Sequence, residues 1–167
     1  MKINEICEII SNYLEKIAEV FSSFFLIIIF IIMFVQVILR YIFSVAIPWG
    51  DEAVRYLIIW VVMLSGSILV KHDDLIKVDF FDNYWPKRFI IYRDLFYKIF
   101  FLIMFIIFVK IGWHQSLISQ KSKLVGFASS GIDISFFIPY LSIPVGFALM
   151  SIQLFLSFLI NIKRRKK

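Results

Sequence analysis

The sequence predicts an all-α integral membrane protein with four transmembrane helices and both termini in the cytoplasm. Apolar residues make up 61% of the 167-residue chain, which is more than one soluble domain of this length can bury. A helix of about 20 apolar residues crosses the ~30 Å of hydrocarbon in a bilayer. Four apolar runs approach or exceed that length, at about residues 20–39, 53–70, 95–113 and 136–162. We therefore expect a single membrane domain over 1–167, surrounded by lipid in the bacterial inner membrane.

The distribution of basic residues predicts how the four spans are oriented. Four spans place residues 1–19, 71–98 and 163–167 on one side, and these segments hold 13 of the 18 lysines and arginines. Cytoplasmic segments of membrane proteins are enriched in Lys and Arg. Both termini are therefore predicted to be cytoplasmic. The net charge of +6 is interpreted as a signature of topology and not of nucleic-acid binding.

An amphipathic helix is predicted over residues 3–19, ahead of the first span. Its apolar residues recur at helical spacing: Ile3, Ile6, Ile10, Tyr13, Leu14, Ile17 and Phe21. Its polar face is acidic, and anionic lipid headgroups would not attract such a face. A protein neighbour, a simple extension of the first span and a solvated face are the three interpretations. The apolar run that follows is too long for a secretory signal peptide, so this segment is expected to stay in the mature protein.

Gln36 and Arg40 lie four residues apart on one face, near the far end of the first span. An arginine at the centre of a span costs about 3 kcal/mol on insertion scales, so Arg40 is placed at the membrane interface. Gln36 lies deeper and is expected to find a partner on another helix. That partner is either a neighbouring helix of this chain or another subunit.

The turn that opens the second span concentrates polar and aromatic residues: Trp49, Asp51, Glu52 and Arg55. Pro48 and Gly50 break the chain here, so the two acids occupy the positive end of the new helix. Either acid is spaced to pair with Arg55. The turn is interpreted either as a helix cap with an interfacial ion pair and a belt tryptophan, or as a contact surface for a partner.

Short interfacial segments are expected between the second and third spans. Apolar residues there are spaced to lie along the headgroup plane: Leu75, Val78, Phe81 and Trp85. In the fourth span, Pro139 and Pro144 predict a kinked or irregular first half. Small residues at Ser65–Ser67 and at Ser142 and Gly146 would let helices approach closely in lipid.

The chain lacks the residue patterns of an enzyme or a cofactor site. It has no Gly-rich phosphate loop, no Ser-His-Asp set and no zinc-ligand spacing, and its one cysteine excludes a disulfide framework. His72 and His114 fall on opposite sides of the membrane in the predicted topology, so they cannot share one haem. The spans are nearly free of ionisable residues at depth, unlike an ion or proton pathway. The sequence therefore predicts an accessory or scaffolding membrane subunit without enzymatic activity or cofactor.

The second span and its flanks resemble the small membrane subunit of tripartite ATP-independent periplasmic (TRAP) transporters, the DctQ-type family. The resemblance covers about residues 36–153 and rests on the order of its features along the chain. These are Arg40, the turn Trp49-Gly50-Asp51-Glu52, Trp60, the small pair Ser65-Gly66, Lys71, the tail Ile76-Lys77-Val78-Asp79, and Pro144-Val145-Gly146. One feature departs from the family pattern: Leu75 stands where a histidine is common, and His72 lies three residues too early to replace it.

The resemblance implies a role in sodium-coupled uptake of an organic acid, of the C4-dicarboxylate or sialic acid type. In this family a periplasmic binding protein delivers the substrate, and a large membrane subunit moves it by an elevator mechanism. The small subunit binds and stabilises the static scaffold of the large one. The resemblance implies a partner interface at ten residues: Gln36, Arg40, Trp49, Asp51, Glu52, Arg55, Trp60, Gly66, Pro144 and Gly146. Lys121 and Lys123, in the loop before the fourth span, are candidates for docking the binding protein.

Two other classes remain open from the residues alone. One is a four-span accessory or assembly subunit of another membrane complex, and the other is a free-standing small channel.

Overall fold

The computed structural model describes residues 2–72, 87–128, 131 and 133–164. The chain is all-α in these residues, apart from an isolated bridge between Lys123 and Ser135. Four helices are long and apolar enough to cross a membrane, which confirms the predicted fold class. The elements are α1 (Lys2–Ile42), α2 (Pro48–Lys71), α3 (Lys87–Ile118), the 3₁₀ turn η2 (Ser119–Lys121), α4 (Val125–Ala128) and α5 (Phe137–Arg164).

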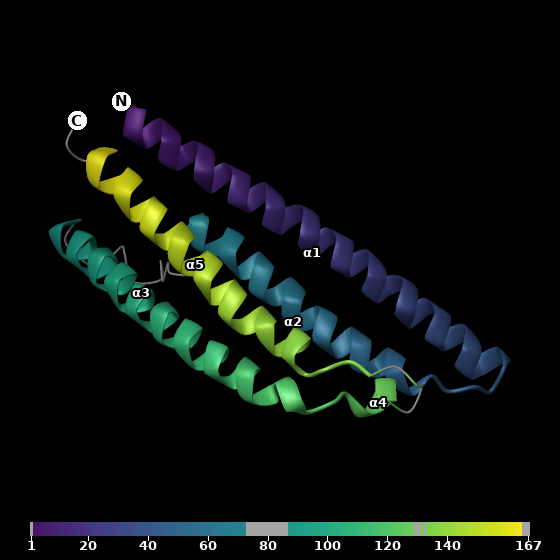
Figure 1. Ribbon diagram of the computed structural model, residues 1–167. Coiled ribbons are helices and arrows are strands. Elements are labelled where there is room, and N and C mark those ends of the chain that lie inside the picture. Colours follow the sequence, from purple (N-terminus) through teal and green to yellow (C-terminus); the bar gives the residue numbers. More distant parts are fainter. Residues whose placement is uncertain (1, 73–86, 129–130, 132, 165–167) are drawn as a thin grey trace.

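The four long helices pack side by side in the order α1, α2, α5, α3 (Figure 1). Helices α2 and α5 occupy the middle of the bundle, and α1 also touches α5. Helix α1 begins and α5 ends at the same end, which we call the terminal end. The opposite end, where α1 connects to α2, we call the turn end. An even number of spans requires this placement of the two chain ends.

Helix α1 is one continuous helix, without a break between the predicted amphipathic segment and the first span. Neither glycine nor proline occurs within it, so no residue ends the helix near position 19. Its 41 residues extend over about 60 Å, roughly twice the thickness of the hydrocarbon core. The segment 3–19 is therefore an extension of the first span, one of the three interpretations that the sequence left open.

Helix α5 continues through Pro144, where the sequence predicted a kinked or irregular stretch. Pro139 lies in the first turn, where a missing N–H costs little. The ring of Pro144 faces Gly112 of α3, and a Cβ on that glycine would lie 3.1 Å from Pro144 Cδ. Gly112 therefore leaves the space that lets α5 remain helical beside α3.

Helices α2 and α5 meet through small residues placed opposite methionines. A Cβ on Gly66 of α2 would lie 2.2 Å from Met150 Cε, and one on Gly146 of α5 would lie 2.5 Å from Met63 Cβ. The buried core continues from this contact through Val70, Phe105 and Leu154. The close approach agrees with the small-residue packing that the sequence predicted for these two spans.

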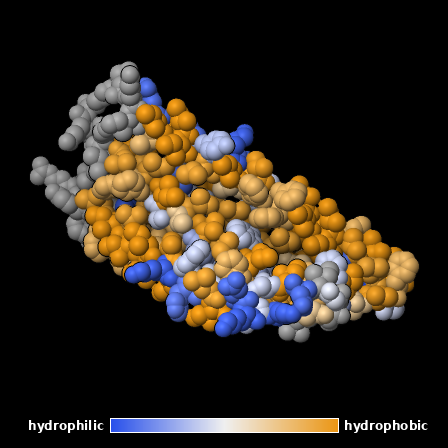
Figure 2. All heavy atoms as spheres, in the orientation of Figure 1, coloured by the Kyte–Doolittle hydropathy of each residue, from blue (hydrophilic) through white to orange (hydrophobic). Residues whose placement is uncertain are grey.

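Most of the face seen in Figure 2 is apolar. Along α1, side chains such as Phe30, which is 70% exposed, face outward for most of the helix. Such a surface is stable only when lipid or another apolar protein surface covers it. The predicted interfacial residues Leu75, Val78, Phe81 and Trp85 lie outside the described residues.

Candidate partner interface

The turn end is shaped by the connection between α1 and α2. Val45 N–H donates to Leu39 O (3.1 Å), and Ser44 adopts a left-handed conformation with φ of 53°. Pro48 then starts α2, because its fixed φ suits the first helical position and its missing N–H would have no helical partner there. The chain thus reverses direction within five residues and brings the first turn of α2 against the end of α1.

Gln36 and Asp51 are joined across this turn. Gln36 Nε2 donates a hydrogen bond of 3.1 Å to Asp51 Oδ1. Gly50 is buried beneath the glutamine, and a Cβ at this position would come within 2.4 Å of Gln36 Nε2. The predicted partner of Gln36 on another helix is therefore Asp51, and Gly50 provides the room for their contact.

An open groove of about 320 Å³ lies at the same place, between the end of α1 and the connection. Gln36, Arg40 and Asp51 supply its polar side chains. The rest of its lining is mainly apolar, from Met33, Val37, Tyr41, Val45, Ala46, Ile47 and Pro48. Arg40 and Asp51 are both exposed, so the groove offers a cation and an anion beside an apolar floor.

The remaining residues of the predicted turn surface lie in the first two turns of α2 and do not line this groove. Glu52 is half-buried, and Arg55 is exposed one turn further along α2. Trp49 is half-buried against Phe127 of α4, with ring centroids 5.9 Å apart. Asp51 lies in the first turn of α2, where the helix dipole favours a carboxylate, but the N-cap residue Ile47 makes no side-chain capping bond.

Four further residues of the predicted interface pack between the helices of this chain. Trp60 packs on Phe25 of α1 at a centroid distance of 6.2 Å. Gly66, Pro144 and Gly146 are buried between α2, α3 and α5 in the contacts described above. These four residues hold the helices of this bundle together, whereas Arg40, Asp51 and Arg55 present exposed side chains.

The described residues of the connection between α3 and α5 lie at the turn end and are joined by backbone hydrogen bonds. Leu124 N–H donates to Ile134 O (2.9 Å), and Phe136 N–H donates to Ser122 O (3.0 Å). Lys123 Nζ lies 2.5 Å from Asp133 Oδ2, and both side chains are more than 60% exposed. Of the two predicted docking lysines, Lys123 thus has a partner within the loop, and Lys121 is exposed beside it.

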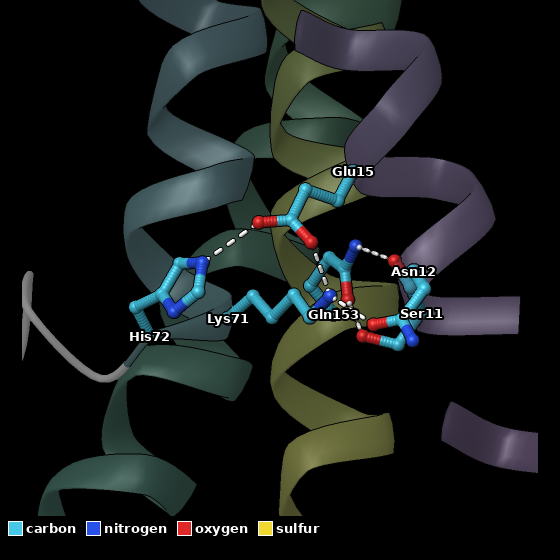
Figure 3. A network of polar contacts seen from close by, with 6 residues as sticks. All are labelled: Ser11, Asn12, Glu15, Lys71, His72 and Gln153. Carbon is cyan, nitrogen blue, oxygen red and sulfur yellow. Dashed lines mark hydrogen bonds and ion pairs between the residues drawn. The ribbon is translucent and has the colours of Figure 1, made fainter. Parts of the chain in front are cut away.

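A second polar cluster, at the terminal end, was not predicted from the sequence (Figure 3). Ser11 Oγ of α1 donates to Gln153 Oε1 of α5 (2.7 Å), and Gln153 Nε2 donates back to Ser11 O (3.0 Å). Ser11 is 4% exposed and Gln153 is 1% exposed. Buried amide groups without partners are costly, so this reciprocal pair favours one register of α1 against α5.

Helix α2 joins the same cluster through its last residues. Lys71 Nζ donates to Asn12 Oδ1 (2.5 Å) and pairs with Glu15 Oε2. His72, the residue just after α2, has Nε2 2.7 Å from Glu15 Oε1, so this carboxylate lies between Lys71 and His72 (Figure 3). We name Ser11, Asn12, Glu15, Lys71, His72 and Gln153 the three-helix cluster.

No local signal in the sequence could have identified the three-helix cluster. Ser11 and Gln153 are 142 residues apart, and Glu15 and Lys71 are 56 apart. The acidic face of residues 3–19 suggested a protein neighbour, but it did not indicate which helix that neighbour would be. Part of that face meets α2 of the same chain.

No group of three or more metal-ligating side chains occurs in the parts of the chain that the structure describes. The polar residues brought together at both ends instead make hydrogen bonds and ion pairs between helices. These arrangements are suited to holding helices and partners in place.

Sequence comparison places the chain among transporter components. The profile of the DctQ component of tripartite ATP-independent periplasmic transporters matches residues 29–164. The chain is 25% identical over 166 residues to the C4-dicarboxylate TRAP transporter small permease protein DctQ of Vibrio cholerae, covering 86% of this chain and 70% of that protein.

Two longer proteins also match. The chain is 32% identical over 138 residues to the isethionate TRAP transporter permease protein DctMQ of Oleidesulfovibrio alaskensis, covering 76% of this chain and 20% of that protein. It is 25% identical over 101 residues to the sialic acid TRAP transporter permease protein SiaT of Haemophilus influenzae, covering 60% of this chain and 16% of that protein. The chain thus spans about a fifth or less of the length of these two relatives.

Most of the chain, including all four spans at least in part, lies within the matched profile. The order of features that suggested the family from the sequence lies within it too. The protein is a multi-pass protein of the bacterial inner membrane, and it belongs to the DctQ component family of tripartite ATP-independent periplasmic transporters.

Proposed function

We propose that this chain is the small subunit that binds a large TRAP membrane subunit and stabilises its static scaffold. The complex would take up an organic acid, delivered by a periplasmic binding protein, together with sodium. The relatives are named for isethionate, sialic acid and C4-dicarboxylates, which are all acids, so an organic anion is the common substrate class. Both termini are cytoplasmic in this proposal, and the turn end faces the periplasm.

The observation that carries the proposal is the groove at the turn end. It places exposed Arg40 and Asp51 beside an apolar floor at the end of a span. A plain helix cap would need no such groove, whereas a partner could bury the apolar floor and meet both charges. The long relatives support a membrane partner, since in them the matching region is a small part of a larger permease protein.

The apolar exterior supports a scaffolding role. The described spans pack with each other through small residues, apolar side chains and a few hydrogen-bonded polar groups. The described helices thus form a packed bundle with many exposed apolar side chains, suited to lie beside another membrane protein.

The test is Arg40→Ala in the small subunit co-expressed with the large membrane subunit of the same transporter. If Arg40 lies in a dehydrated contact, its loss leaves a partner charge unpaired and costs ~3–5 kcal/mol. If it lies at a wet surface, the cost is ~0–1 kcal/mol. We expect the large subunit to be lost from affinity purification of the small one, and uptake to be abolished, with the small subunit still inserted.

Lys110→Ala is the matched control, because Lys110 is an exposed cation near the turn end of α3. It should retain both the partner and uptake. Glu52→Ala should resemble Arg40→Ala, and Trp49→Ala should be milder because it removes packing without leaving a charge unpaired. If both Arg40→Ala and Glu52→Ala keep normal partner recovery and uptake, the turn only begins α2 and the proposed interface is contradicted.

A further inference from the structure

The part of α1 that precedes the matched family profile carries its own exposed apolar stripe. The profile begins at residue 29, so the first 28 residues lie outside it. Within them, Ile6, Ile9, Tyr13 and Ile17 are three or four residues apart and therefore line one helix face. Their side chains are 53%, 66%, 68% and 37% exposed.

The three-helix cluster determines where this stripe lies relative to the membrane. Glu15 is paired with Lys71, at the end of the second span, and Gln36 is paired with Asp51, at its beginning. The 21 residues between Glu15 and Gln36 cover about 32 Å of helix, which matches the hydrocarbon thickness. Residues 2–14 therefore project by about 20 Å beyond that boundary, and they carry Ile6, Ile9 and Tyr13 with them.

The extension stands upright and does not lie on the membrane surface. It continues α1 without a break and runs beside α5 toward the terminal end (Figure 1). The buried bonds between Ser11 and Gln153 hold it there. An amphipathic helix that binds lipid headgroups lies in the plane of the interface. The upright extension does not bind lipid in this way, so a protein surface is the better cover for the far part of this stripe.

The charges around the stripe indicate which kind of partner covers it. Among the side chains described in residues 5–19, the exposed acids Glu5, Glu8 and Glu19 outnumber the exposed base Lys16. An anionic leaflet would not attract this surface. The cytoplasmic segments of membrane proteins are rich in Lys and Arg, so those of a large membrane subunit would complement it.

We propose that the stripe Ile6, Ile9, Tyr13 and Ile17 is a second docking surface for the large membrane subunit. Its occupant is a basic segment on the cytoplasmic side of that subunit, with an apolar face. This inference rests on the proposed function. It adds a contact on the opposite side of the membrane from the groove at Arg40. The small subunit would then hold its partner at both ends of the bundle.

Site-specific photocrosslinking in the intact complex tests this contact. A benzophenone amino acid replaces Ile9 or Tyr13 in one set of samples, and Ile103 of α3, which is 53% exposed, in the control. We expect adducts with the large subunit from positions 9 and 13, at least about tenfold more abundant than from position 103. A complex that co-purifies normally but gives adducts only with lipid, or only between two small subunits, overturns the inference and leaves the proposed function standing. Failure of the unmodified pair to co-purify would instead contradict the proposed function.

Substitutions give an independent measurement. The triple variant Ile6→Ser, Ile9→Ser, Tyr13→Ser should reduce recovery of the large subunit by at least about tenfold, since apolar anchors dominate most interfaces. The matched control Ile6→Val, Ile9→Val, Tyr13→Phe keeps the stripe apolar and should retain the partner. The melting temperature of the small subunit alone should be the same in both, because these side chains are exposed. Glu5→Lys should also lower recovery. Full recovery in both the serine and the lysine variants would overturn the inference.

Discussion

At the scale of single residues, three glycines differ in which neighbouring atoms lie where a Cβ would stand. A Cβ on Gly50 would meet the end of the flexible Gln36 side chain, and one on Gly66 would meet the terminal methyl of Met150. Both neighbours can rotate away. A Cβ on Gly146 would meet Cβ of Met63, which is attached directly to the backbone of α2. Relief there requires α2 and α5 to move apart.

This difference predicts the order in which three alanine substitutions lower the free energy of unfolding. Gly146→Ala should lower the free energy of unfolding by about 1–3 kcal/mol, as overpacking of a tight contact does. Gly66→Ala should cost less, since a methionine end adapts readily. Gly50→Ala should be mildest for stability, yet it should displace Gln36 from Asp51. Thermal unfolding in detergent would measure the order, and a Gly66→Ala variant less stable than Gly146→Ala would contradict the packing described for α2 and α5.

At the scale of elements, the extension of α1 is held by contacts with two other helices. Lys71 and Glu15 have side chains only 16% and 24% exposed, and Asn12 and His72 complete their hydrogen bonds. A pair so shielded from water contributes more than a surface ion pair does. These contacts hold the extension of α1 against α2 at Asn12 and Glu15.

Glu15→Ala tests these contacts. It leaves Lys71 without its carboxylate, and a hydrogen bond to a charged group contributes about 1.5–3 kcal/mol. We expect amide hydrogen exchange in residues 5–14 to accelerate while exchange in 20–40 stays slow. Lys16→Ala is the matched control on the exposed side of the same helix and should change neither. If the amides of residues 5–14 exchange equally slowly in Glu15→Ala and Lys16→Ala, the Ser11–Gln153 bonds suffice to hold the extension.

At the scale of the whole molecule, the two polar clusters lie at opposite ends of an otherwise apolar bundle. The turn end carries the groove with Arg40 and Asp51, and the terminal end carries the three-helix cluster. In our proposal the first faces the periplasm and the second the cytoplasm. In the same proposal, their separation by about one hydrocarbon thickness places the two clusters at the two boundaries of the bilayer.

Cysteine labelling tests this orientation. In a Cys7→Ser background, a cysteine at Ser122 should react with an impermeant thiol reagent added from outside, because Ser122 is exposed in the loop at the turn end. A cysteine at Lys16 is also exposed and should react only after the membrane is permeabilised. Labelling of position 16 in intact cells would reverse the proposed topology and move the second docking surface to the other side.

The sequence alone was sufficient for the fold class, the four spans and the family. These follow from the length and spacing of apolar runs and from the order of local features along the chain, none of which depends on contacts between distant residues. Chain-local reasoning also predicted a polar partner for Gln36, because an amide within a span needs one.

Only the tertiary structure decided which residues meet. Gly66, Pro144 and Gly146 carry the family resemblance, yet they pack inside this bundle. Glu15, one acid of the acidic face of α1, meets Lys71 and His72 of the same chain. Helix periodicity shows which residues share a face, but it does not say which other helix that face will touch. That choice depends on the packing of all four helices at once, and the bonds of Ser11 with Gln153 become visible only when α1 and α5 lie side by side.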